Sequence, residues 1–357
     1  MKKFKKIFLI IIILILILII AAMSYVIYNM SPVNNDDKTY KEVIVSSGMG
    51  RREIADLLYE EKIIKNADFF YHYMKIKKAD LIYAASYSFS PSMKASEVLK
   101  TLLEGGKNTN TVMITFKEGV NMRSIANTIA EKTNNTYDDV MNKIKDEDYL
   151  NSLIEKYWFI TDEIKNSDIY YSLEGYLFPD TYEFASADVS VEEIFEVMLD
   201  KMDDVLSGYK KQIEKSKYNI HELLTLASVT QLEGFTSQDF KNIASTFYNR
   251  LDSGMSLGSC VTSYYGVKKD MTSELYQSEI DAVNPYNTRS GKMDGKLPVG
   301  PLGSPSSDAI DAVMNPVKTD YYYFVSDKNN KLYFNKTYEQ HEQTISELQN
   351  KGLWYEW

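Results

Sequence analysis

A single cysteine, Cys260, stands in this chain of 357 residues, which excludes an internal disulfide framework. An oxidising compartment therefore adds nothing to the fold, and we interpret Cys260 as a small buried residue rather than a reactive thiol. Histidine is also scarce. His72, His221 and His341 are far apart, and there is no His-Glu-x-x-His motif or paired-cysteine spacing. We expect no metal and no other cofactor.

Basic residues are few beyond the extreme N-terminus. Without the four lysines among residues 2–6, the chain has 36 basic and 50 acidic residues, a formal charge of −14. Phosphate groups repel a chain of this sign, so nucleic acid and anionic lipid surfaces are excluded as main partners. Hydrophobic residues make up 44% of the sequence, enough for real cores, and the length indicates two or three domains.

One long apolar run, residues 7–28, contains no charged residue. As an α-helix it is about 33 Å long at ~1.5 Å per residue, which exceeds the ~30 Å hydrocarbon core of a membrane. The preceding lysines predict a cytoplasmic N-terminus. The alternative is a cleaved signal peptide, although its apolar core is usually shorter. We predict a single-pass anchor in the cytoplasmic membrane, with an extracytoplasmic working part.

The remaining sequence alternates between strand-like and helix-like periodicity, which predicts an α+β protein. A polar stretch with a proline is typical of a tether, and the sequence changes character from His221 onward, where we place the chemistry. The expected organisation is cytoplasmic lysines and transmembrane anchor over 1–29, tether over 30–39, a small module over 40–110, a middle region over 111–218, a mixed α+β catalytic domain over 219–351 and a tail over 352–357.

A weak internal repeat relates the module to the middle region at an offset of 71 residues. Each copy has a strand-like run, a glycine turn and an amphipathic helix. This unit resembles the LysM type of glycan-binding module, and the alternative is a common β-turn-α unit without that function. The matched pairs are Gly48 with Gly119, Arg52 with Arg123, Ile54 with Ile125, Ala55 with Ala126 and Leu58 with Ile129.

Glu233 is expected at the end of a mostly apolar helix over 223–233. On a period of 3.6 residues it shares a face with Leu226 and Val229, so its carboxylate points toward apolar side chains. Desolvation and the negative end of the helix dipole both raise the pKa of such a group, as a general acid requires. The alternative is an exposed helix-end residue or an ion pair, for example with Arg250.

Glu233 closes the frame LASVTQLE of residues 226–233, and a second helix-like segment ends in Asn249-Arg250-Leu251. This arrangement is similar to the membrane-anchored endolytic murein transglycosylase family, whose signature helix ends in Glu-x-Glu and precedes a helix ending in Asn-Arg-Leu. Further segments agree in order and spacing, so that the resemblance covers nearly the whole chain. They are residues 173–182, 257–266, 284–288, 297–302 and 321–327, followed by Phe334-Asn335 and His341.

The resemblance implies cleavage of the β-1,4 bond after N-acetylmuramic acid inside nascent peptidoglycan strands, leaving 1,6-anhydro ends and terminating strand elongation. It implies that Glu233 protonates the glycosidic oxygen and then accepts the proton of the C6 hydroxyl of the same sugar. One carboxylate suffices, because the nucleophile belongs to the substrate, unlike in two-carboxylate hydrolases. The family also implies work beside wall-synthesis glycosyltransferases and transpeptidases.

Several residues downstream of Glu233 are candidates for binding the glycan. Amide and hydroxyl groups suit sugar hydroxyls and acetamides, and the loop over 297–305 is restricted enough to form a cleft wall. The alternative for each is an ordinary loop residue that is satisfied within the protein, and the run over 321–325 predicts a buried strand. The expected substrate-binding residues are Tyr286, Asn287, Thr288, Pro298, Gly300, Asn335 and His341.

Three residues depart from the family pattern. Gln231 replaces the first glutamate of the pair, Gly258 replaces a glutamine and Cys260 replaces an aspartate. These changes motivate a rival hypothesis, a catalytically weak glycan-binding scaffold in a wall-synthesis complex. A third hypothesis, an anchored glycan-binding protein with an unrelated C-terminal domain, requires the frame around Glu233 to be accidental. Because Glu233 is retained, an enzyme is favoured.

Overall fold

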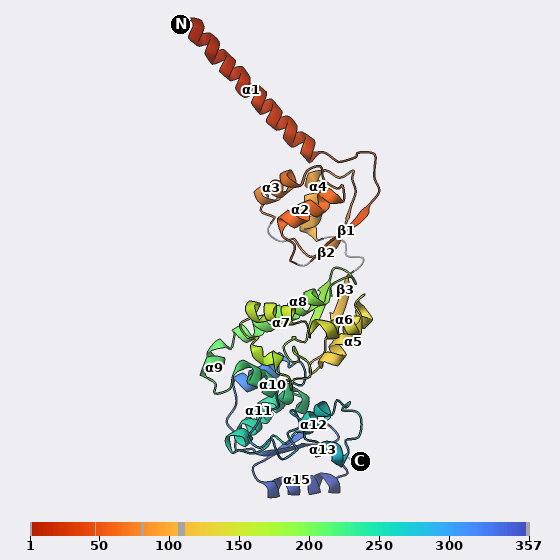
Figure 1. The fold of residues 1–357 in the computed structure, drawn as a ribbon, viewed down its shortest axis with the longest axis vertical. Helices are drawn as coiled ribbons and strands as arrows, with labels where there is room; N and C mark the ends of the chain where they lie inside the picture. Colours follow the sequence, from red (N-terminus) through yellow and green to blue (C-terminus); the bar gives the residue numbers. More distant parts are fainter. Residues whose placement is uncertain (1, 47, 80–81, 106–110, 355–357) are drawn as a thin grey trace. The chain divides into compact units, whose positions relative to one another are not determined.

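The computed structural model describes residues 2–46, 48–79, 82–105 and 111–354 (Figure 1). It divides the chain into two compact units, one of Met1–Met113 with Glu183–Val189 and one of Ile114–Tyr182 with Ser190–Trp357. Helices dominate, and the strands of the described residues form three two-stranded sheets. The predicted α+β class is therefore confirmed. Residues 47, 80–81 and 106–110 of the predicted module and 355–357 of the predicted tail lie outside the described residues.

The N-terminal helix α1 runs from Lys2 to Met30. From Ile13 to Tyr28 its described large side chains are apolar and exposed. No helix in the described part of the chain combines the length and the hydropathy that a membrane span needs. The predicted span over 7–28 includes residues 7–12 and Ile15, whose side chains lie outside the description. The anchor therefore stays a prediction.

The first unit packs three helices against one antiparallel strand pair. Strand β1 (Lys41–Val45) pairs with β2 (Ala85–Phe89), and Val43 lies opposite Tyr87. The strand alternates between exposed and buried side chains, as a half-buried strand must. Its buried face joins one core with the three helices. These helices are α2 (Arg51–Glu60), α3 (Ala67–Ile76) and α4 (Ala95–Glu104).

The internal repeat seen in the sequence is a structural repeat. In both copies a strand leads into a glycine with positive φ, Gly48 at 85° and Gly119 at 75°, a conformation that glycine adopts without a Cβ penalty. The helices that follow are α2 and α5 (Met122–Lys132), and their matched apolar residues are all buried. A β-turn-α unit therefore occurs twice, and its glycan-binding role stays a prediction.

The second unit contains most of the helices and the residues around Glu233. Its strands β5 (Tyr323–Ser326) and β6 (Leu332–Asn335) pair antiparallel. Strands β3 (Val112–Thr115) and β4 (Thr181–Phe184) form another two-stranded sheet, and each belongs only in part to the second unit. The remaining elements are α6 (Tyr137–Lys143), α7 (Glu147–Lys156), η1 (Asp162–Lys165), α8 (Val191–Ser207), α9 (Lys210–Lys215), α10 (Ile220–Glu233), α11 (Ser237–Asp252), α12 (Cys260–Gly266), α13 (Gln277–Ile280), α14 (Ser307–Met314) and α15 (Tyr338–Asn350).

Helix α10 forms the centre of this unit, because it is buried on nearly every side. Helices α11 and α14 pack against it, and α10 and α11 lie side by side in Figure 1. Helix α11 begins with a capping box, since the Thr236 hydroxyl accepts from Asp239 N–H and the Asp239 carboxylate accepts from Thr236 N–H. A Cβ on Gly234 would lie 2.6 Å from the Phe240 ring, so this bend requires glycine.

The predicted buried strand over 321–325 is only half-buried, and the prediction is wrong in this respect. In the structure the strand is β5, and none of its four residues is fully buried. A hairpin of two strands has no neighbouring strand at either edge. Helix α15 packs against both of its strands, but this leaves the side chains of β5 only half-buried. Phe324 makes the main apolar contacts, with Phe247 at 5.8 Å and Phe334 at 5.8 Å between ring centroids.

Candidate active site

Glu233 is the last residue of α10, and its half-buried carboxylate receives a hydrogen bond from Ser259. The Ser259 hydroxyl donates to Oε1 over 2.5 Å. Burial raises the pKa of Glu233, while this hydrogen bond and the charges of Arg289 and Arg250 act in the opposite direction. The net direction is upward, as the position at the end of an apolar helix predicts. A carboxyl group of this kind is suited to donating a proton.

Ser259 is held in place by a pair of buried threonines. Its backbone N–H donates to the Thr288 hydroxyl over 3.1 Å, and its carbonyl accepts from the Thr262 hydroxyl over 2.6 Å. The two threonine hydroxyls lie 2.8 Å apart. The sequence singles out Thr288 but not Ser259 or Thr262. The only available signal is that both belong to segment 257–266 of the family resemblance.

Two arginines bind backbone carbonyls of the loop before α12. Arg250 donates from Nε to the Tyr322 carbonyl over 2.6 Å and from Nη1 to the Leu257 carbonyl over 2.5 Å. Arg289 donates from Nη1 to the Gly258 carbonyl over 2.9 Å. Both of these hydrogen bonds from Arg250 go to backbone carbonyls. Arg250 forms no ion pair with Glu233, so that alternative is wrong. Both charges still favour an ionised Glu233.

Gly258, which replaces the glutamine of the family pattern, has a structural reason in this chain. Its φ of 59° lies in the left-handed region that favours glycine, and a Cβ there would stand 3.0 Å from Arg250 Nη1. Glycine therefore lets the loop close over the guanidinium of Arg250. The structure gives no comparable reason for cysteine at position 260.

Cys260 is exposed, and the prediction that it is buried is wrong. As the first residue of α12 it lies one position after Ser259, beside Arg289 Nη1 at 3.3 Å from its sulfur. Nearby protein raises the pKa of the thiol by desolvation, and Arg289 partly offsets this. Small apolar residues are usually buried, but Cys260 is the first residue of α12, and its side chain is exposed there.

Gln231, which replaces the first glutamate of the family pattern, binds a loop through its side chain. Its Oε1 accepts from the backbone N–H of Ser306 over 2.9 Å, and one turn earlier the Ser228 hydroxyl accepts from Leu302 N–H over 3.0 Å. The amide oxygen of glutamine performs this acceptor role without a charge. Helix α10 therefore positions the loop that leads into α14.

Pro298 and Gly300 are buried where this loop packs on the start of α10. His221 Nε2 lies 2.9 Å from the Val299 carbonyl oxygen, and a Cβ on Gly300 would lie 3.3 Å from the same nitrogen. The other ring nitrogen, Nδ1, lies 2.8 Å from the Tyr176 hydroxyl. The loop thus packs against the start of α10, and Pro298 and Gly300 have little surface left to contact a ligand.

Tyr286, Asn287 and Thr288 are fully buried. The Tyr286 hydroxyl accepts from the backbone N–H of Tyr170 over 3.1 Å. Asn287 accepts from the Ser263 hydroxyl over 2.7 Å and donates to two backbone carbonyls. Their polar groups are thus satisfied within the protein, so direct binding to a sugar requires these bonds to break. Of the three, Thr288 binds Ser259 directly and Asn287 binds α12 at Ser263, so their role in binding substrate stays a prediction.

Asn335 and His341 come from β6 and α15 and are half-buried. The His341 ring stacks on Tyr323 with centroids 5.6 Å apart, and Tyr323 lies 5.3 Å from the Arg250 guanidinium carbon. Asn335 Oδ1 accepts from the Thr344 hydroxyl over 3.1 Å. Among the described residues, Asn335 Nδ2 and His341 Nδ1 are buried without a hydrogen-bond partner. His341 is therefore linked to Arg250 through Tyr323, and the two unpartnered atoms are buried, so neither is exposed to a ligand in this structure.

A cavity of about 770 Å³ lies between α5, α12 and the end of α10, and its wall includes neither Glu233 nor Ser259. Leu232, the residue before Glu233, and Val261, the residue after Cys260, form part of its wall. Arg123 and Tyr137 from the second repeat and the segment after α12 complete it. The sequence does not predict this cavity, because its walls are far apart along the chain.

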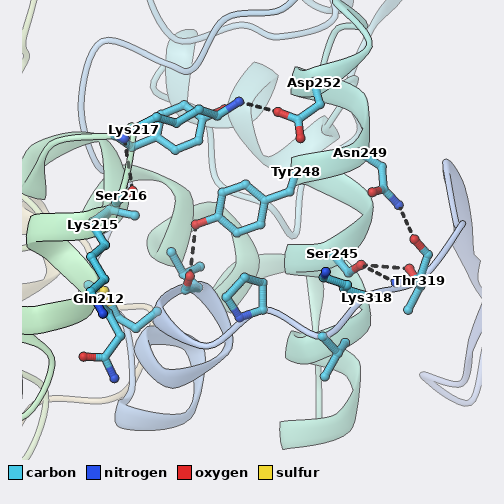
Figure 2. A pocket seen from close by; sticks show the side chains of 16 residues that line it. Gln212, Lys215, Ser216, Lys217, Ser245, Tyr248, Asn249, Asp252, Lys318 and Thr319 are labelled. Atoms are coloured by element: carbon cyan, nitrogen blue, oxygen red, sulfur yellow. Dashed lines mark hydrogen bonds and ion pairs between the residues drawn. The ribbon is translucent and has the colours of Figure 1, made fainter.

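A second cavity, of about 680 Å³, lies along α11 (Figure 2). Figure 2 shows Tyr248, whose hydroxyl donates to the Val313 carbonyl over 3.0 Å, and the ion pair of Lys217 with Asp252. Its wall includes neither Glu233 nor Ser259, so it is separate from the candidate active site. In the described part of the chain, no group of three or more His, Cys, Asp or Glu side chains is placed to hold a metal ion.

Comparison with known proteins agrees with the predicted resemblance. The model of the YceG-like family matches residues 43–347. The chain belongs to the YceG-like family. A protein of Bacillus subtilis named endolytic murein transglycosylase is 34% identical over 314 residues, which cover 87% of this chain and 86% of that protein.

Two further matches extend this result. A protein of Streptococcus pneumoniae with the same name is 31% identical over 370 aligned positions, covering 99% of this chain and 66% of that protein. The crystal structure of a YceG-like protein from Listeria monocytogenes superposes with a TM-score of 0.62 at 32% identity, covering 86% of this chain and 99% of that one. The family resemblance predicted from the frame around Glu233 is therefore confirmed.

Proposed function

We propose that this protein is an endolytic peptidoglycan lytic transglycosylase, a carbon–oxygen lyase that cuts the β-1,4 bond between N-acetylmuramic acid and N-acetylglucosamine. The observation that carries the proposal is the half-buried Glu233 carboxyl, with its pKa raised by burial and one oxygen bound to Ser259. The relatives named endolytic murein transglycosylase support the same reaction.

In the proposed reaction the protonated Glu233 carboxyl donates its proton to the glycosidic oxygen as the bond from that oxygen to C1 breaks. The resulting carboxylate accepts the proton of the C6 hydroxyl, and the C6 oxygen bonds to C1 to close the 1,6-anhydro ring. Because Ser259 occupies Oε1, Oε2 is the oxygen free to carry the proton. The charges of Arg289 and Arg250 stabilise the carboxylate formed in between.

The surroundings of Glu233 favour a nucleophile that belongs to the substrate. Hydrolases that use water or an enzyme nucleophile place a second carboxylate about 5–10 Å from the acid. The charged groups that act on the pKa of Glu233 are the cations Arg289 and Arg250. This setting and the relatives named endolytic murein transglycosylase support ring closure through C6 rather than attack by water.

We also propose that α1 anchors the protein in the cytoplasmic membrane with its N-terminus inside. The exposed apolar side chains between Ile13 and Tyr28 form a surface far too large for a soluble helix, and a membrane would cover it. In this arrangement the LysM-like unit and the site act on nascent strands, and cleavage ends their elongation. Wall-synthesis glycosyltransferases and transpeptidases are the expected neighbours.

The test is a digest of purified, uncrosslinked glycan strands with the full-length protein and its Glu233→Gln variant in water enriched in oxygen-18. We expect 1,6-anhydro ends from the unaltered protein alone. Reducing ends that carry oxygen-18 would instead establish a hydrolase. Binding without cleavage by either form would favour the scaffold hypothesis that Gln231, Gly258 and Cys260 motivate.

A further inference from the structure

The two copies of the internal repeat differ in what surrounds their glycine turn. In the first unit, a Cβ added to Gly48 would meet no described atom within 4 Å apart from its neighbours in the chain. In the second unit, a Cβ on Gly119 would lie 3.1 Å from Leu232 Cδ2 and 3.6 Å from Gln231 Cγ. Both glycines have a positive φ, so the backbone requirement is the same and only the contact with α10 differs. The second turn thus packs against the residues that precede Glu233.

The Gly119 turn, residues 117–120, is bonded to the loop before α14 in both directions. The Gly119 N–H donates to the Ser304 carbonyl over 2.7 Å, and the Ser304 N–H donates to the Val120 carbonyl over 2.8 Å. The contact leaves no room for a side chain, since a Cβ on Gly303 would lie 2.6 Å from the Gly119 carbonyl oxygen. The two bonds therefore fix the distance between the turn and the loop.

The same loop is bonded to the C-terminal part of α10. As described above, Gln231 accepts from the Ser306 N–H, and Ser228 accepts from the Leu302 N–H. The Gly119 turn, the loop over 302–306 and the end of α10 therefore contact one another in pairs. Glu233 follows directly after this junction, and its carboxylate is the group that Ser259 binds. A shift of the last turn of α10 changes the distance between the Glu233 carboxylate and the Ser259 hydroxyl.

We propose that the Gly119 turn positions Glu233, by holding the last turn of α10 against the loop over 302–306. Gly119 is a positioning residue for the proposed reaction, on which the inference rests, and the second copy of the repeat supports the active site. The distance of 3.1 Å to Leu232 Cδ2 is shorter than the ordinary carbon–carbon contact of about 3.5–4.0 Å, so a methyl group at position 119 pushes Leu232 away. Glu233 moves with its neighbour, and a general acid depends on its place at the glycosidic oxygen.

The experiment measures cleavage of uncrosslinked glycan strands by the full-length protein and its Gly119→Ala variant. We expect Gly119→Ala to lower kcat about tenfold with little change in KM, because the acid is displaced while the strand still binds. The alkaline limb of kcat/KM should also move to higher pH, since the hydrogen bond from Ser259 that lowers the pKa of Glu233 is weakened. A smaller fraction of folded protein would lower kcat without moving this limb.

Gly48→Ala is the matched control, because it imposes the strain of a positive φ at the equivalent position without a contact to α10. It should retain the kcat and the alkaline limb of the unaltered protein. The double variant Gly119→Ala/Leu232→Ala removes the Cδ2 atom that the new methyl group meets, and it should recover most of the lost kcat.

Normal kcat with an unmoved limb in Gly119→Ala would overturn the positioning proposal and leave the proposed function intact. A loss of kcat that Leu232→Ala does not relieve would do the same. Failure of the unaltered protein to cut the strands would remove both.

Discussion

The buried carboxylate of Glu174 accepts a hydrogen bond from the Tyr265 hydroxyl over 2.8 Å. The same carboxylate accepts from Met122 N–H at the start of α5, at 2.8 and 3.1 Å to its two oxygens. One side chain thus joins the start of α5 to α12, the helix whose preceding residue Ser259 binds Glu233. Burial raises the pKa of Glu174 to about 8.

Glu174 should make stability depend on pH. Its pKa is near 4.5 when unfolded and about 8 when folded, so the folded protein binds the extra proton between these values. The stability from this group is complete below pH ~4.5 and is lost as pH rises through 8. Glu174→Gln should remove that loss, which is on the order of a few kcal/mol. Thermal melts at pH 5, 7 and 9 measure it.

The exposed Glu155→Gln variant is the control for this measurement and should follow the unaltered protein at every pH. If the difference between Glu174→Gln and the unaltered protein is the same at pH 5 and pH 9, Glu174 does not titrate in this range.

The hydrogen bond from Ser259 should set the alkaline limit of activity. This bond lowers the pKa of Glu233, so Ser259→Ala should raise it and move the alkaline limb of kcat/KM to higher pH. The limb reports the proton of the general acid, which is lost as pH rises through its pKa. Ser259→Thr retains the hydroxyl and should leave the limb in place. An unchanged limb in Ser259→Ala would contradict a titrating role for Glu233.

Cys260 offers a chemical probe of access to the site. It is the single cysteine and is exposed, so a bulky maleimide should label the native protein at one position and block cleavage. Because desolvation raises the pKa of its thiol, labelling should accelerate as pH rises. Cys260→Ser should stay active after the same treatment. Full activity of quantitatively labelled protein would place the substrate away from α12.

The bend after Glu233 should tolerate no side chain. Gly234→Ala places a Cβ 2.6 Å from the Phe240 ring, which should cost about 1–3 kcal/mol of stability and displace the Glu233 carboxylate. Both the melting temperature and kcat should fall. Gly208→Ala, where the nearest atom to the new Cβ is at 3.5 Å, should change neither. A stable Gly234→Ala variant with normal kcat would show that the bend does not position Glu233.

Features with a local cause could be predicted from the sequence. The cap of α3 at Asn66, which accepts from Phe69 N–H, depends on residues within one turn. The position of Glu233 at the end of α10 follows in the same way from apolar periodicity and a terminating glycine. The repeat around Gly48 and Gly119 was visible because each copy is short and continuous.

The sequence by itself therefore determined the α+β class, the repeat, the helix that ends in Glu233 and the family of the chain. Only the tertiary structure decided that Ser259 binds Glu233, that Cys260 is exposed, that Glu174 is buried and that Arg123 faces the cavity beside Leu232. The physical reason is the range of the interactions. Caps and periodicity act within a few residues, whereas burial and charge around a site depend on segments that are distant in the chain and meet only after packing.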